Sequence, residues 1–98
     1  MKPIRLSDRA VLHVAFRGCS ESEVIDAIRT IPWTDAELGR LQCRKDFAYR
    51  RERNGVRYQS KQVHPVFVEA PHEIVVVTVD VCYFREACAR YVVSGSGR

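Results

Sequence analysis

The 98-residue sequence predicts an α+β domain in which two N-terminal helices pack on one face of a roughly four-stranded antiparallel sheet. Helix-start signals and apolar residues at helical spacing occupy residues 7–31, whereas apolar and polar residues alternate with period two from residue 37 onward. The Asn54-Gly55 pair in this second part is a strong hairpin signal. We expect one domain over residues 1–91 and a disordered tail over 92–98.

Both predicted helices have sequence signals at their ends. Ser7 can cap a first helix that ends at Gly18. Ser20 opens a second helix, with Glu23 three residues later as its capping-box partner, and Pro32 stops it. Residues 3–6, before the first helix, can form a short edge strand.

Four strands are expected near residues 38–45, 56–63, 65–69 and 74–83, and part of 46–53 can pair with 56–63 across the Asn54-Gly55 turn. The β-branched run 74–81 is the expected central strand. Because successive side chains of a strand point to opposite faces, one set of residues in this strand is expected to face the helices, namely Val75, Val77, Val79 and Val81. The opposite, basic face would carry Thr78 and Asp80 with Arg40, Gln42, Arg44, Arg57, Gln59 and Lys61.

Arginine dominates the basic residues, thirteen to three over lysine, and it concentrates between residues 40 and 61. The net charge of +4 is mild, so the clustering carries more weight than the total. Because the guanidinium fork grips phosphate bidentately, this stretch indicates a phosphate-rich partner, RNA or DNA.

Other classes of protein receive little support. The cysteines at 19, 43, 82 and 88 form no CxxC pair and no zinc-binding spacing, so we expect reduced thiols and no metal or other cofactor. The longest apolar run, residues 74–79, is too short to cross a bilayer, and charged residues interrupt the start of the chain. We therefore expect a cytoplasmic protein without a membrane partner.

Several short motifs are similar to those of domain-of-unknown-function family 4258, whose opening pattern is S-x-H-A, R-G-I-S, x-x-E-V and x-x-A-I. The corresponding residues here are Ser7 to Ala10, Arg17 to Ser20, Glu23-Val24 and Ala27-Ile28, with Gly39-Arg40, Arg44-Lys45, residues 55–61 and residues 73–78 matching the later pattern. This chain has Arg9 where the family often has His, and its histidine comes at position 13.

This family resembles the RelE/ParE and BrnT-like toxins of bacterial type II toxin–antitoxin systems. The resemblance implies a RelE/barnase-like α+β fold and a metal-independent ribonuclease, or an inactive relative, encoded beside a small acidic antitoxin. Metal-free RNA cleavage needs a base, an acid and cations that stabilise the phosphate. We assign Arg40, Lys61, His64 and Tyr83 as catalytic candidates: the two cations stabilise phosphate, the imidazole transfers protons, and the phenol polarises phosphate or stacks on a base.

A second set of residues is expected to bind RNA: Arg44, which is also a candidate for stabilising the phosphate, with Lys45 and Arg57 on the strands, and Arg9, His13 and Arg17, which recur every four residues along the first helix. Alternatives remain open for all of these residues, which also suit a solvated sheet face and the wet side of a helix. The leading hypothesis is a toxin-like ribonuclease. The second is a module that binds RNA or a protein without cleaving, and the third is a structural domain whose Arg face only keeps it in solution.

Overall fold

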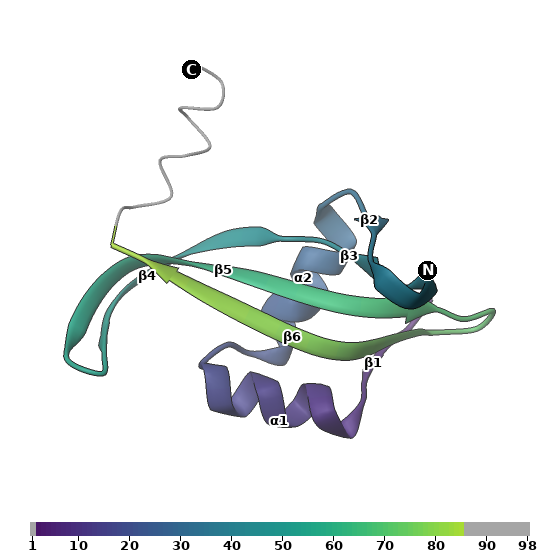
Figure 1. Cartoon of the computed structure of the whole chain (residues 1–98), viewed down its shortest axis with the longest axis horizontal. Coiled ribbons are helices and arrows are strands. Elements are labelled where there is room, and N and C mark those ends of the chain that lie inside the picture. Colours follow the sequence, from purple (N-terminus) through teal and green to yellow (C-terminus); the bar gives the residue numbers. More distant parts are fainter. Residues whose placement is uncertain (1, 86–98) are drawn as a thin grey trace, which may run out of the picture. The chain divides into compact units, whose positions relative to one another are not determined.

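The computed structural model describes residues 2–85, in which two helices and a three-residue strand precede the main strands of the sheet. Strand β1 (Ile4–Leu6) leads into α1 (Asp8–Arg17) and α2 (Glu21–Thr30). The short β2 (Thr34–Asp35), the 3₁₀ turn η1 (Glu37–Gly39) and β3 (Leu41–Gln42) follow. The long strands β4 (Lys45–Arg53), β5 (Val56–Glu69) and β6 (Ile74–Phe84) complete the fold (Figure 1).

Local signals set both helices, as predicted. The Ser7 hydroxyl accepts the Ala10 N–H at the start of α1, and Gly18 ends this helix in the left-handed conformation, with φ 83°. Ser20 and Glu23 form the complete capping box of α2. Each helix buries one apolar stripe, which comprises Ala10, Val14, Val24, Ala27 and Ile28.

Within residues 2–85 the sheet is mixed and has six strands, which corrects the prediction of about four antiparallel strands. Its order is β1-β6-β5-β3-β2, with β4 also paired to β5. β1 runs parallel to β6, with Ile4 opposite Ile74 and Leu6 opposite Val76. A parallel pair needs a long connection, and the chain between β1 and β6 supplies one, since it contains both helices and the other strands.

The predicted strand 38–45 is divided, because backbone conformation and a proline both interrupt it. Leu38 and Gly39 have φ of 60° and 73°, which is incompatible with an extended strand. Further on, Pro65 has no N–H to give to its neighbour, so only the Cys43 N–H to Pro65 carbonyl contact (3.4 Å) is made there. Residues 43–44 accordingly separate β3 from β4, while β5 continues through Pro65 as one strand of 14 residues.

The turn between β4 and β5 confirms the hairpin prediction. Asn54 and Gly55 have φ of 53° and 82°, the left-handed pair that a two-residue hairpin needs. Arg50, inside β4, also has a positive φ of 55°, as the extra residue of a β-bulge does. The side-chain alternation of β4 is therefore not the uniform one that the sequence predicted.

The described chain divides into two units, each of which contains part of β5 and of β6. We call residues 2–45 with 63–81 the helix–sheet unit, and residues 46–62 with 82–85 the hairpin unit. A single domain over residues 1–91 stays a prediction, and the predicted tail 92–98 lies outside the described residues.

The apolar core of the helix–sheet unit corrects the predicted register of β6. Ile74 and Val76 are buried, whereas Val75 and Val77, predicted to face the helices, are only half-buried. Val79 is buried as predicted, three residues after Val76. The alternation therefore shifts by one residue between Val76 and Val79, and period-two reasoning cannot detect such a shift.

Candidate functional site

Three tyrosines gather in the hairpin unit, one from each of its strands. The ring centroids of Tyr49 (β4) and Tyr83 (β6) are 5.0 Å apart at 60°, and Tyr58 (β5) lies 5.4 Å from Tyr83 at 42°. All three side chains are half-exposed. Edge and tilted contacts of this kind hold aromatic rings in place while leaving part of their faces accessible.

Cations lie against this tyrosine cluster. The Arg53 guanidinium is 4.9 Å from the Tyr83 ring centroid, and the Arg51 guanidinium is 5.9 Å from that of Tyr49. The Lys61 ammonium lies 5.4 Å from the Tyr49 ring. We call these six residues, Tyr49, Tyr58, Tyr83, Arg51, Arg53 and Lys61, the Tyr–Arg face.

The charge of the chain is concentrated in the same unit. Residues 46–62 and 82–85 carry six Arg and Lys against two carboxylates, a net charge of +4. The described part of the helix–sheet unit carries eight cations and nine carboxylates, a net charge of −1. The hairpin unit is thus the strongly basic part of the described chain.

Lys61 does not have the exposed position that the sequence predicted. It is only 5% exposed, and the preceding Ser60 is also buried, so the alternation of β5 shifts at this point. Close by, Asp46 is 9% exposed and accepts a hydrogen bond from the Gln62 amide at 3.0 Å. Because Lys61 is buried, its substitution affects folding as well as any ligand contact.

In the helix–sheet unit, His64 is held by an oriented amide. Gln42 donates its side-chain N–H to the Asp35 carbonyl at 2.9 Å, so its Oε1 faces His64 Nε2 at 2.7 Å. Since Oε1 can only accept, Nε2 carries the hydrogen, and Nδ1 holds the lone pair of the neutral ring. Burial, together with the Arg44 guanidinium, holds the pKa of His64 below its usual range, against an opposing effect of Asp80.

Arg40, predicted to contact phosphate, lines a cavity of about 500 Å³ in the helix–sheet unit. Gln42 and Thr78 line it as well, so His64's partner amide borders the same space. Asp35 and Glu37 also line it, however, and their carboxylates make it a poor site for a polyanion. Arg44 is exposed, outside the residues that line this cavity.

The basic stripe of α1 is largely engaged with β6. His13 Nδ1 lies 3.0 Å from Thr78 Oγ1 and 3.4 Å from the Val79 N–H. Arg17 donates to the Val79 carbonyl at 2.7 Å and pairs with Asp80 at 3.2 Å. These two residues fasten the helix to the edge of the sheet, and only Arg9 of the stripe is fully exposed.

The other predicted RNA-binding residues differ in how they are placed. Lys45 is half-buried and pairs with Asp26 at 2.6 Å, so an acidic neighbour already offsets its charge. Arg57 is exposed in the hairpin unit, in β5.

The predicted site residues are divided between the two units. Lys61 and Tyr83 belong to the hairpin unit, whereas Arg40, Arg44 and His64 belong to the helix–sheet unit. Sequence reasoning missed Tyr49, Tyr58, Arg51 and Arg53 as functional candidates. A signal was available in the spacing 49, 51, 53, which places an aromatic and two cations on one side of a regular strand.

Residues 2–85 contain no group of three or more His, Cys, Asp or Glu side chains that could hold a metal ion. Over the same range, no helix is long and apolar enough to cross a membrane. Comparison with protein-family models, curated proteins and solved structures gives no match for this chain. The resemblance to domain-of-unknown-function family 4258 and to toxins therefore stays a prediction from short motifs.

Proposed function

We propose that this protein binds single-stranded RNA through the Tyr–Arg face of the hairpin unit. The observation that carries the proposal is the packing of Arg51 and Arg53 against Tyr49 and Tyr83 in the most basic part of the described chain. Partly exposed tyrosines offer stacking surfaces to bases, and the guanidinium groups beside them offer bidentate contacts to phosphate. Unpaired bases supply the open ring faces that such a surface needs, whereas a duplex does not.

The direct test is the affinity of the whole chain for a labelled single-stranded RNA, measured by fluorescence anisotropy over a range of salt concentrations. We expect single strands to bind more tightly than a duplex of the same sequence, and affinity to fall with a log–log slope of about −0.7 per phosphate contact. Replacing Tyr83 by Leu should weaken binding roughly 10- to 100-fold, as expected for the loss of one stacking platform.

Charge-matched substitutions make this test specific. Arg53→Gln should weaken binding and flatten the salt slope by about 0.7. Arg5→Gln removes the same charge from an exposed residue paired with Glu73 in the helix–sheet unit, and it should change affinity little. Equal effects of the two substitutions would mean that binding follows total charge, which would refute the Tyr–Arg face as the binding site.

A second candidate function, metal-independent RNA cleavage, is favoured by the environment of His64. Its ring is oriented by Gln42, and its lowered pKa favours the neutral form of the imidazole, which can accept a proton. In this reaction His64 Nδ1 takes the 2′-hydroxyl proton, and the 2′-oxygen bonds to phosphorus. The bond from phosphorus to the 5′-oxygen then breaks, which leaves a 2′,3′-cyclic phosphate. The departing 5′-oxygen takes a proton from water, and the proton on His64 returns to the solvent.

Cleavage of labelled RNA in EDTA tests this second candidate. His64→Ala should lower the rate about 10²- to 10⁴-fold if the imidazole is the base. Arg40→Ala and Arg44→Ala should lower it about 10²- to 10³-fold if they stabilise the phosphate. Wild-type protein that binds RNA and leaves it intact would reduce the function to binding alone.

A role as a toxin adds a partner, a small acidic protein that covers the basic hairpin unit. Opposite charge would speed the association and exclude RNA from the same cations. Co-expression with a neighbouring gene that encodes a small acidic protein should then give a stable complex that no longer binds RNA. Normal growth of cells that express this chain alone, without a co-purifying partner, would count against the toxin role.

A further inference from the structure

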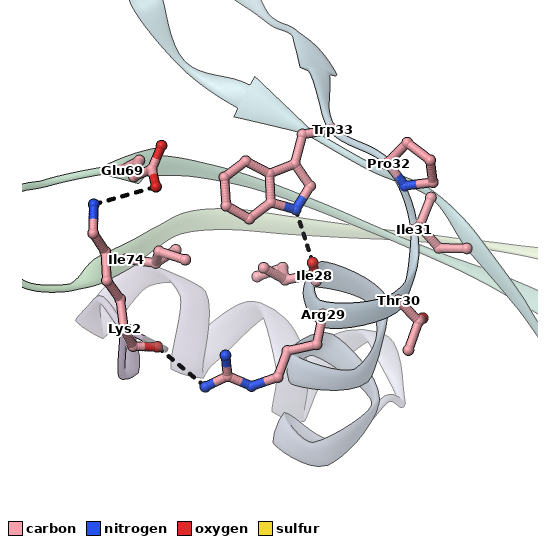
Figure 2. A pocket seen from close by; sticks show the side chains of 9 residues that line it. All are labelled: Lys2, Ile28, Arg29, Thr30, Ile31, Pro32, Trp33, Glu69 and Ile74. Carbon is pink, nitrogen blue, oxygen red and sulfur yellow. Dashed lines mark hydrogen bonds and ion pairs between the residues drawn. The ribbon is translucent and has the colours of Figure 1, made fainter.

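A cavity of about 510 Å³ lies in the helix–sheet unit where α2 ends, and nothing in the proposed RNA binding uses it. Its lining comes from the last turn of α2, the segment 31–33, Lys2, and the facing ends of β5 and β6, where Glu69 and Ile74 lie (Figure 2). This volume is within the range of sites that hold small organic ligands. We propose that the cavity binds a small aromatic carboxylate.

The aromatic wall of this cavity is rigid. The Trp33 indole N–H donates to the Ile28 carbonyl at 2.7 Å, and the ring packs edge-on against Phe67 with centroids 5.1 Å apart at 78°. Figure 2 shows the indole beside Ile28, with Ile74 across from it. A fixed, half-exposed indole next to branched aliphatic side chains suits a flat apolar group.

The charge that selects an anion comes from Arg29. This exposed guanidinium makes one hydrogen bond within the described chain, to the Lys2 carbonyl at 3.2 Å, and no carboxylate there pairs with it. Lys2 itself pairs with Glu69 at 3.2 Å, which neutralises the acidic residue of the lining. The remaining charge is therefore positive, on a fork that can hold a carboxylate with two parallel hydrogen bonds.

The carboxyl end of α2 repels such an anion less than a free helix end would, because two of its last four carbonyl groups, those of Ala27 and Ile28, accept hydrogen bonds. Thr30 Oγ1 donates to the Asp26 carbonyl at 2.7 Å, and the Ile31 N–H donates to the Ala27 carbonyl at 3.1 Å. The Trp33 indole satisfies the Ile28 carbonyl, as described above. The partial negative charge that a free helix end presents is thus reduced at the cavity.

The experiment uses the emission of Trp33, which is the only tryptophan of the chain and therefore reports on this cavity directly. Phenylacetate, which hardly absorbs where tryptophan is excited, is titrated into the whole protein beside neutral phenylacetamide and cationic benzylamine. We expect phenylacetate to change the emission with a Kd on the order of 0.1–1 mM, and the other two to bind at least about tenfold more weakly.

Two variants test whether Arg29 is responsible for the preference for an anion. Arg29→Gln should weaken phenylacetate binding about tenfold and leave phenylacetamide unchanged, since only the charged contact is lost. Arg9→Gln removes the same charge from exposed α1 outside the cavity and should have no effect. Equal binding of the three probes, or equal effects of the two variants, would overturn the proposal, as would an emission that does not change up to about 10 mM phenylacetate.

A carboxylate of this kind can belong to a free metabolite or to the C-terminus of a peptide. A short peptide that ends in phenylalanine distinguishes these sources, with its C-terminal amide as the control. Binding of the acid peptide more than about tenfold tighter than phenylacetate would assign the cavity to chain termini, and equal or weaker binding would assign it to small molecules. RNA affinity, measured in parallel, should not depend on any of these ligands.

Discussion

The two units of the described chain differ in what they bury. Every fully buried hydrophobic residue of the described chain belongs to the helix–sheet unit, including Val24, Val63, Phe67 and Val76. The buried polar and charged residues, Asp46, Ser60 and Lys61, all belong to the hairpin unit. One unit is therefore stabilised mainly by apolar burial, and the other by strand pairing, ring contacts and polar interactions.

The two units also differ in charge, which is the contrast on which the proposed RNA binding rests. The helix–sheet unit has a nearly balanced charge, with a net charge of −1 over its described residues. The hairpin unit has little core to fill, so its side chains supply cations and tyrosines at +4 net charge. We infer that the helix–sheet unit serves as the scaffold and the hairpin unit as the binding element, and four predictions test this contrast.

The largest effect is expected for the core of the helix–sheet unit. Phe67 is fully buried and packs against Trp33, so Phe67→Ala should destabilise the protein by about 3–5 kcal/mol. Denaturant unfolding followed by circular dichroism measures this loss. Tyr58→Ala, in the hairpin unit, is the aromatic control and should cost clearly less. Equal losses would show that the two units do not differ in the way they are stabilised.

Lys61 should come next, because its ammonium is buried. Lys61→Ala leaves a gap and removes the partner of the groups around the ammonium. We expect the free energy of unfolding to fall by about 2–3 kcal/mol. Lys61→Met keeps most of the volume and should recover much of that loss. Unchanged stability of both variants in denaturant unfolding would mean that Lys61 is in effect exposed, as the sequence predicted.

A smaller effect is expected for the contact between Arg53 and Tyr83. A double-mutant cycle with Arg53→Gln and Tyr83→Leu should give a coupling energy of about 0.5–1 kcal/mol in stability, the range of partly exposed cation–π pairs. Arg57→Gln with Tyr83→Leu is the comparison cycle. A coupling as large in the second cycle would reflect general charge effects on the unit.

The smallest effect is expected in the pH dependence of stability, through His64 in the helix–sheet unit. Because the pKa of folded His64 is lowered, the unfolded chain binds more protons below about pH 6.5. The contribution of His64 to stability is present above that pH and is lost as the pH falls through the pKa of the folded state. Chemical denaturation between pH 7.5 and about 5 should show this fall, and His64→Gln should reduce it. An identical pH profile in the variant would exclude His64 as the source.

The helices and the hairpin turn could be predicted because their signals are local. Ser7, Gly18 and the Ser20–Glu23 box act within one turn of their helix. Asn54 and Gly55 adopt the left-handed conformations for which their small or absent side chains are suited. Caps and turns of this kind depend on contacts between residues a few positions apart, so the local sequence is enough to predict them.

The sheet faces and the site depended on tertiary structure, because a one-residue shift reverses every later side chain in a strand. Shifts near residue 77 of β6 and at Ser60–Lys61 of β5 changed which residues are buried, so Lys61 came to lie inside. In β4, Arg51 and Arg53 came to lie over the Tyr49 and Tyr83 rings. The parallel pairing of β1 with β6 joins segments about 70 residues apart. The sequence by itself determined the local elements and the clustering of arginines along the chain. Only long-range packing decided which arginines and tyrosines lie in contact.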